Sequence, residues 1–171
     1  TRSRERGEIF AGKTLASFSY AIVIVLAMGL VGLAAGSAAW GFNSFTSLSG
    51  TRVSAGQGFA LLIATLAIYA MPLLAIVCFG LMLSTSTSNS AASVVGALMW
   101  ALLMQLIGVL PGTGAIQPYL LGTQFDAWHG LLRTPTDWVP VVRAVWVCAI
   151  YAFVPLAAAY LVFLRRDVAG D

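Results

Sequence analysis

The chain has 171 residues, of which 60% are hydrophobic and only 9% are charged, and its mean hydropathy is +0.92. Soluble domains carry about a quarter charged residues, so this composition excludes an ordinary globular protein and indicates one compact membrane domain spanning residues 1–171. The formal net charge is +3, and basic residues gather near the two ends of the chain, which is typical of topology signals rather than of nucleic-acid binding.

Residues 7–14 read GEIFAGKT and match the phosphate-loop pattern G-x-x-x-x-G-K-[ST]. A phosphate loop needs a buried strand before it and a soluble helix after it, so that backbone N–H groups can surround the phosphates. Here the preceding residues are charged or hydroxylated, and residues 15–39 contain no acidic or basic side chain. We therefore interpret the match as accidental and expect no ATP site on this chain.

Four apolar segments reach the length of a membrane span: residues 15–39, 59–83, 91–110 and 141–164. In lipid, every backbone polar group must be satisfied within the segment, so each is predicted to be a helix. The predicted fold is an all-α polytopic integral membrane protein. Pro72 and Pro155 interrupt the second and fourth segments and are expected to kink them.

The first span carries three glycines, Gly29, Gly32 and Gly36, and the last two form a G-x-x-x-G pair that permits close helix approach. The motif serves helix packing within one chain, which we favour, and also the seam of a dimer. Gln105 in the third span is interpreted as polar glue or as a pathway residue, and the sequence does not decide between them.

The connections between the spans differ in character. Residues 84–90, STSTSNS, are predicted to be a short turn whose hydroxyls and Asn89 cap the next helix. Residues 111–140 are predicted to form an amphipathic helical hairpin that lies in, or dips into, the outer interface. Its apolar and polar helical faces are distinct: Phe125, Trp128, Leu131 and Leu132 on one, and Asp126, His129 and Arg133 on the other.

Four crossings place both termini on one side of the membrane, and the basic residues differ between the two sides. The side of the termini carries Arg2, Arg4, Arg6, Lys13, Arg165 and Arg166. The other side carries Arg52, Arg133 and Arg143, partly offset by Asp126 and Asp137, together with Trp40, Phe42, Trp128 and Trp138. The positive-inside rule therefore predicts cytoplasmic termini and an aromatic belt at the outer interface.

Few residues offer chemistry. His129 and Asp126 lack the ligand count of a metal site and have no nucleophile beside them, so an interfacial polar face is favoured over catalysis and no metal or cofactor is expected. Cys78 and Cys148 are expected to be buried thiols, too far apart for a disulfide. The span centres contain no acidic or basic residue, whereas ion- and proton-driven pumps place ionisable groups there. If the chain moves a substrate, the energy must come from a partner.

The opening run T-R-S-R-E-R-G-E-I-F-A-G-K resembles the cytoplasmic segment of ATP-binding cassette permeases of the type-2 exporter family, in which T-R-P-x-S-R-x-x-I-x-x-G-K leads directly into a transmembrane helix. The matching residues are Thr1, Arg2, Arg6, Ile9, Gly12 and Lys13, whereas Ser3 replaces the usual proline. The closing run LVFLRRD at residues 161–167, the Ser/Thr-rich turn and the long outer segment also fit the layout of that family.

The resemblance implies a permease that forms a substrate pathway in a bacterial or archaeal inner (plasma) membrane, pairs with a second permease half as a homo- or heterodimer, and contacts lipid. Cytoplasmic ATPase subunits would bind ATP and Mg. Residues 1–13 would be the coupling segment, with Arg4, Arg6, Glu8 and Lys13 toward the ATPase, and residues 111–140 a re-entrant hairpin closing the exit. Two further helices normally precede this point in the family, so a truncated or unusually short subunit is expected.

Two other functions stay open at this point. The first is a non-transporting four-helix accessory or channel-like subunit, and the second is a membrane-embedded enzyme, for which no catalytic pair is visible. The uncharged interior favours lipids, drugs or amphiphilic peptides as substrates of a permease, without identifying one.

Overall fold

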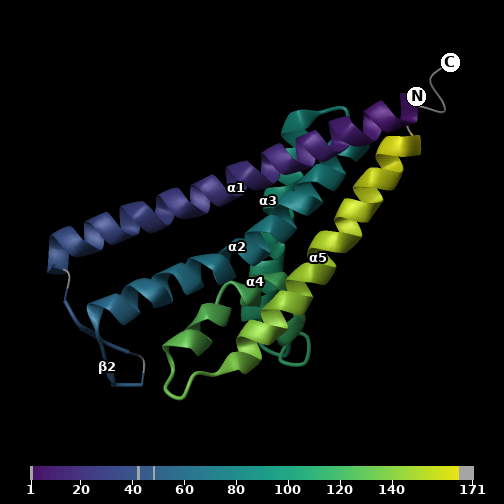
Figure 1. The fold of residues 1–171 in the computed structure, drawn as a ribbon. Helices are drawn as coiled ribbons and strands as arrows, with labels where there is room; N and C mark the ends of the chain where they lie inside the picture. Colours follow the sequence, from purple (N-terminus) through teal and green to yellow (C-terminus); the bar gives the residue numbers. More distant parts are fainter. Residues whose placement is uncertain (1, 42, 48, 166–171) are drawn as a thin grey trace.

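The computed structural model describes residues 2–41, 43–47 and 49–165, with the side chains of residues 7–41, 43–44, 46–47 and 49–164. Four helices within these residues are long and apolar enough to cross a membrane: α1 (Arg2–Trp40), α2 (Ala55–Ser86), α3 (Ser90–Val109) and α5 (Trp138–Arg165). The protein is thus an all-α polytopic membrane protein, as predicted (Figure 1). A minimal antiparallel pair, β1 (Phe45–Thr46) with β2 (Arg52–Val53), joins α1 to α2.

The helix α1 is continuous from Arg2 to Trp40, so the charged amino-terminal residues and the apolar span form one element. The coupling segment that the resemblance implies lies within this helix from Arg2 onward. Ser3 stands where the resembled family has proline, and no proline interrupts the run. Two hydroxyls follow the helical backbone: Thr14 Oγ1 donates to the Phe10 carbonyl and Ser17 Oγ to the Lys13 carbonyl, both at 2.9 Å. The charged amino-terminal end and the apolar span are therefore parts of one continuous helix.

The ends of α2 and α3 are set by caps. Ser54 and Gln57 form a capping box, in which the Gln57 N–H donates to Ser54 Oγ at 3.4 Å, so α2 begins four residues before the predicted span. At the other junction, Asn89 Oδ1 accepts from the N–H groups of Ala91 and Ala92 at 3.0 and 3.3 Å. The predicted Asn89 cap of the third span is confirmed.

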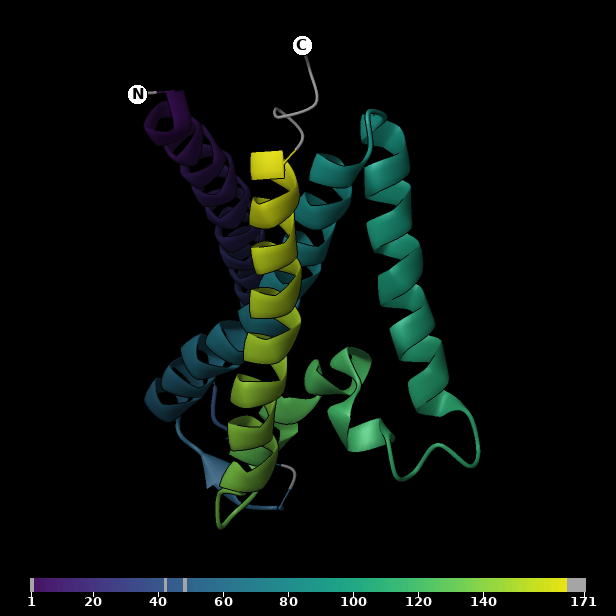
Figure 2. The same ribbon diagram turned by 90° about the vertical axis from the view of Figure 1, so that its right-hand side faces the viewer.

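The amino end of α1, the carboxyl end of α5 and the α2–α3 turn lie at one end of the molecule, here called the terminal end (Figure 2). The β1–β2 pair and the α3–α5 connection lie at the opposite end, the loop end. Trp40 and Trp138 are exposed at the loop end, whereas Phe42, Arg166 and the side chains of Arg2, Arg4, Arg6 and Arg165 lie outside the described residues.

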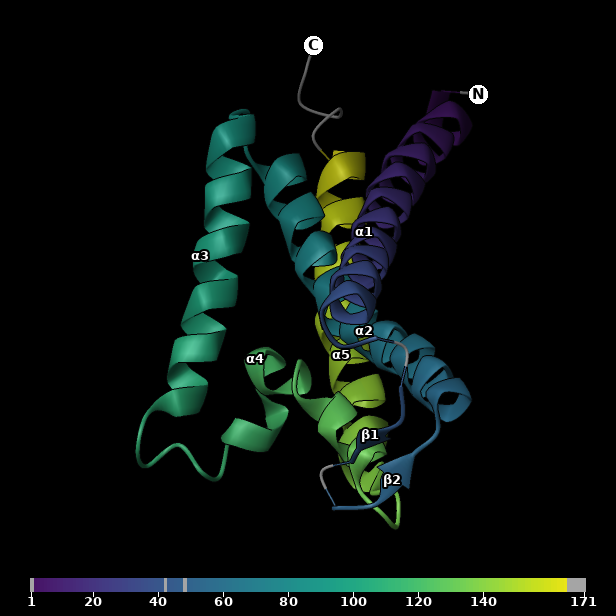
Figure 3. The same ribbon diagram turned by 90° about the vertical axis from the view of Figure 1, so that its left-hand side faces the viewer.

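The central pair of helices is α2 and α5, with α1 and α3 on its flanks (Figure 3). The helix α2 bends near its middle, and Pro72 lies fully buried inside it. The views show no comparable bend in α5, so the kink expected at Pro155 is absent. A proline removes one backbone donor, and the remaining contacts of α5 with α2 hold that helix close to straight.

Two buried clusters fill the space around this pair. One contains Ile68, Ala127, Leu131 and Ala144, and the other contains Ala75, Leu121 and Cys148. Each cluster combines α2, α5 and the connection between α3 and α5. Cys78 and Cys148 are both free and buried, as predicted.

Candidate functional site

The connection between α3 and α5 forms a compact re-entrant segment, residues 117–132. It comprises three short pieces: the 3₁₀ helix η1 (Gln117–Tyr119), α4 (Leu121–Gln124) and the 3₁₀ helix η2 (Ala127–Leu132). The helical segment predicted between the last two spans is therefore present, and it is made of short pieces rather than of one continuous helix. The segment rises from the loop end into the space between α3 and α5 (Figure 2).

Polar side chains inside the re-entrant segment satisfy its irregular backbone. Gln124 is only 3% exposed, and its Nε2 donates to the carbonyls of Pro118 and Leu120 at 2.9 and 2.8 Å. Thr123 Oγ1 lies 2.7 Å from the Gln117 carbonyl. Non-helical backbone at membrane depth is tolerated only where its polar groups find such partners, so these contacts permit the segment to enter the bundle.

Two glycines allow the re-entrant segment to pack tightly against its neighbours. A Cβ at Gly122 would lie 2.8–2.9 Å from backbone atoms of Met104 and Gln105 in α3, and a Cβ at Gly130 would collide with the Asp137 carbonyl. Backbone atoms cannot give way as a side chain can. Sequence reasoning missed both positions, although isolated glycines within an amphipathic pattern are a known signal of close backbone approach.

The four residues proposed for the outer amphipathic segment lie on η2 or next to it. Asp126 and Arg133 are exposed, whereas Trp128 and His129 are half-buried. The Asp126 and His129 side chains approach to 3.9 Å, and Arg133 lies 3.6 Å from Asp137. Exposed pairs at such distances contribute about 0–1 kcal/mol. They are surface contacts of the segment.

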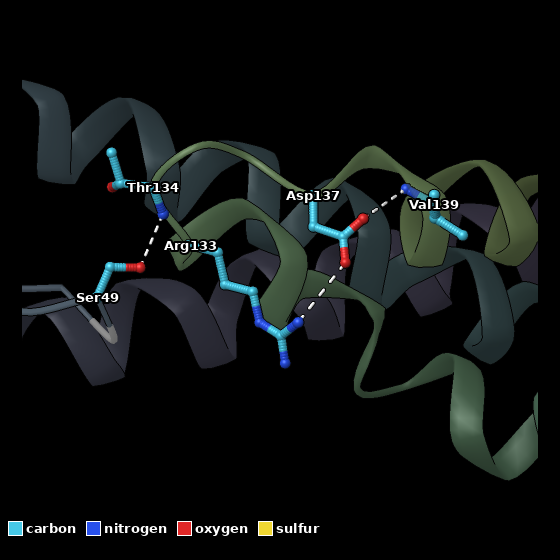
Figure 4. A network of polar contacts seen from close by, with 5 residues as sticks. All are labelled: Ser49, Arg133, Thr134, Asp137 and Val139. Carbon is cyan, nitrogen blue, oxygen red and sulfur yellow. Dashed lines mark hydrogen bonds and ion pairs between the residues drawn. The ribbon is translucent and has the colours of Figure 1, made fainter.

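A polar network ties the β1–β2 turn to the start of α5 (Figure 4). The Thr134 N–H donates to Ser49 Oγ at 2.8 Å, and Asp137 accepts from the Val139 N–H at 3.1 Å while it pairs with Arg133. The first and third connections of the chain are thereby joined at the loop end.

The terminal end of α1 contacts two other helices. Phe10 is 7% exposed, and its ring lies 5.6 Å from Tyr160 and 5.5 Å from Phe163, both in α5. Lys13 Nζ donates to Ser84 Oγ in α2 at 2.9 Å. Glu8 is exposed beside this contact. Of the proposed coupling residues, Lys13 is thus engaged within the chain, and Glu8 faces outward.

The glycines of α1 divide into two groups. Gly29 packs against Leu66 of α2, where an added Cβ would lie 2.5 Å from a methyl group. At Gly32 and Gly36 an added Cβ would meet no described atom within 4 Å. These two glycines line an apolar groove of about 420 Å³ between the loop-end halves of α1 and α2, which Trp128 and Leu132 also line. Of these three glycines, Gly29 is therefore the one that packs closely against another helix among the described residues.

A second groove, the α3 groove, has a volume of about 790 Å³ and lies between α3 and the re-entrant segment. The helix α3 contributes the face between Met99 and Val109, which includes Gln105, and the re-entrant segment contributes Gln117, Thr123, Phe125 and Asp126. This groove runs from the middle of α3 to its loop end.

Comparison with known protein families identifies the family to which the chain belongs. A family model described as a protein of unknown function, DUF2705, matches residues 1–169. The chain belongs to the DUF2705 family. No curated protein and no solved structure matches it. The family description names no activity, so a function for this DUF2705 protein has to be argued from its own residues.

The GEIFAGKT motif of this DUF2705 chain lies wholly inside α1. A phosphate loop offers free backbone N–H groups to its ligand, whereas the N–H groups in the interior of an α-helix are bonded to carbonyls one turn earlier. Residues 7–14 therefore have the wrong backbone conformation for a phosphate loop.

Proposed function

We propose that this DUF2705 protein is the membrane-spanning permease subunit of an ATP-binding cassette exporter. It would form the substrate pathway in a bacterial or archaeal inner membrane, with cytoplasmic termini. A separate ATPase subunit would bind ATP and Mg. A second permease half, identical or related, would complete the pathway.

The observation that carries this proposal is the continuity of α1. Charged residues at the start of a spanning helix can report the movement of a cytoplasmic partner only if no hinge separates them from the span. Residues 2–40 form one helix, and the resemblance of residues 1–13 to a coupling segment falls on its first turns. A displacement at Arg4 or Glu8 would reach the membrane through this rod.

The contacts at the terminal end support the same role. Phe10 lies against Tyr160 and Phe163, and Lys13 bonds to Ser84, so α1 touches both α5 and α2 just inside the charged residues. A force on the first turns of α1 would therefore act on the central helix pair as well.

The lack of acidic and basic residues at the span centres also supports a partner-driven process. A pump that uses an ion gradient needs ionisable groups within the membrane to carry the coupling ion. ATP hydrolysis on a partner would supply the energy in their place.

Co-purification with an ATPase tests the proposal. Arg4→Ala, Arg6→Ala and Glu8→Gln together should leave membrane insertion intact, because Arg2, Lys13, Arg165 and Arg166 still mark the inner side. The same variant should lose an ATPase that co-purifies with the wild-type chain, or lose its substrate-stimulated hydrolysis, since charge-assisted hydrogen bonds to that partner would be absent.

The matched control removes three charges from the loop end, with Arg52→Ala, Arg133→Ala and Asp137→Asn, and should retain the ATPase. Normal assembly and normal transport by the first variant would contradict the proposal. A wild-type chain that is isolated without any ATPase would instead favour a non-transporting accessory subunit.

A further inference from the structure

The α3 groove combines an apolar wall with a polar rim that carries one charge. We propose that it binds a small organic cation bearing an apolar chain. This inference rests on the proposed permease function and names the substrate class that such a permease would move.

The apolar wall of the groove is the face of α3 that includes Met99, Leu102 and Leu106. Leu102 and Leu106 are more than half exposed, and α3 stands apart from α5 with the re-entrant segment between them (Figure 2). Ligand pockets for drug-sized molecules have volumes of about 300–1,000 Å³, and this groove, at about 790 Å³, falls within that range. An alkyl chain or fused ring system would fit along the wall.

The rim of the groove has acceptors for a donor group. Asp126 lines it with a side chain that is 74% exposed, and it is the one acidic or basic residue among the described residues of the lining. Gln105 also lines the groove, and its side chain is exposed. A carboxylate and an exposed amide on the rim favour a cation that can donate hydrogen bonds.

Among the described residues, the Asp126 carboxylate has one long contact with a basic side chain. His129 Nδ1 lies 3.9 Å from its Oδ1. Arg143 lines a different cavity that Asp126 also lines. Among the described residues Arg143 has no ion-pair partner. Since the Asp126 side chain is 74% exposed, its carboxylate is accessible to a cation in the groove.

The arrangement of apolar and charged groups along the groove suits an amphiphilic cation. Its apolar part begins near the middle of α3, and the re-entrant segment contributes the Asp126 carboxylate. An amphiphile would lie with its chain at the membrane centre and its ammonium group near the membrane surface. The re-entrant segment would then separate that ammonium group from the α2–α5 pair.

Photoaffinity labelling of the full chain in lipid nanodiscs tests this inference directly. The probe is decylammonium with a diazirine in its chain, and labelled residues are mapped by mass spectrometry. We expect labels on the stretch from Met99 to Val109, removed by excess decylammonium but not by decyl sulfate. Asp126→Asn should weaken labelling about tenfold, the effect of losing one charge-assisted contact.

Two control variants keep the test specific. Asp137→Asn removes a carboxylate at the same end of the molecule that does not line the groove, and it should label as the wild type does. Leu103→Trp should fill the groove and abolish labelling, whereas Leu98→Trp, on an exposed position of α3 outside the lining, should not. If Asp126→Asn fails to fold, the loss of labelling in Leu103→Trp still tests whether the probe binds in the groove.

Three results would overturn the inference: equal labelling of Asp126→Asn and wild type, equal competition by decyl sulfate, or labels spread over α1 and over the part of α3 before Met99. Labelling uses the chain alone and the ATPase test uses the complex, so the two proposals can fail separately. Groove labelling without a co-purifying ATPase would remove the permease and keep the site, and the opposite pattern would remove only the site.

Discussion

Two of the neighbours of α2, the helices α5 and α1, pack against it in different ways. The α5 side is closed by small residues with no exposed surface, including Ala75 and Ala144, and the re-entrant segment adds Leu121 and Leu131 to the same clusters. On the α1 side, Gly29 reaches Leu66 at the middle of the helix, and beyond it Gly32 and Gly36 meet no described neighbour.

From this difference in packing we infer a fixed core, made of α2, α5 and the re-entrant segment, and a movable helix, α1. The α2–α5 pair and the re-entrant segment share buried clusters, so they would move together. The helix α1 is held at its terminal end by Phe10 and Lys13 and is open at its loop end. A rod fixed near one end and free at the other is suited to transmit a displacement across the membrane.

The largest expected effect is damage to the α2–α5 core. Ala75 is 0% exposed and lies in a cluster with Leu121 and Cys148. Ala75→Leu adds three carbon atoms where no space exists, and overpacking of this kind costs about 1–3 kcal/mol. We expect a melting temperature in detergent several degrees below that of the wild type, measured by thermal aggregation. An unchanged melting temperature would show that the core is looser than described.

Removal of the aromatic contact at the terminal end should have the next largest effect. Phe10→Ala deletes two ring contacts, to Tyr160 and Phe163, each worth about 0.5–1.5 kcal/mol. We expect a loss of about 2 kcal/mol in the free energy of unfolding, and faster proteolysis near residues 1–15. Tyr20→Ala is the control, because Tyr20 is 70% exposed on the same helix, and it should change neither quantity.

A smaller effect is expected at Lys13. Lys13→Met keeps the length of the side chain and removes the hydrogen bond to Ser84, at a cost of about 0.5–1.5 kcal/mol. The same variant tests the phosphate-loop interpretation, because a functional phosphate loop would lose ATP affinity when its lysine is replaced. We expect no saturable ATP binding by either the wild type or the variant. Micromolar binding that Lys13→Met abolishes would contradict the helical role given to GEIFAGKT.

The smallest effect should come from Gly36, on the open half of α1. Gly36→Ala meets no described atom within 4 Å and improves helix propensity by about 1 kcal/mol. The isolated chain should therefore be equally or slightly more stable. Size-exclusion chromatography with light scattering of this variant addresses the interpretation left open by the sequence: loss of a dimer would identify Gly32 and Gly36 as its seam.

Sequence reasoning located the helices because the length and apolar character of a span are strong local signals. The Asn89 cap was also predictable, since a capping side chain accepts from the N–H groups two or three residues further along the chain, which is a local interaction. Interactions between distant parts of the chain were not readable. Phe10 with Tyr160, and Lys13 with Ser84, depend on how α1 crosses α5 and α2.

The re-entrant segment illustrates the same limit. The helical spacing of residues 125–133 indicated its polar and apolar faces. Its division into η1, α4 and η2 was not predicted. Gly122 and Gly130 are placed by contact with α3 and with the start of α5, and a local pattern carries no information about those partners.

The most direct test of the account measures whether α1 moves at its loop end. Spin labels at Ser37 in α1 and Gln57 in α2 report that end, and labels at Ala11 and Ser86 report the terminal end, in a background with Cys78→Ala and Cys148→Ala. Double electron–electron resonance distances are recorded on the complex with its ATPase, with and without ATP and Mg. The account predicts a shifted distance distribution for Ser37–Gln57 and an unchanged one for Ala11–Ser86. Identical Ser37–Gln57 distributions in the two states would contradict it.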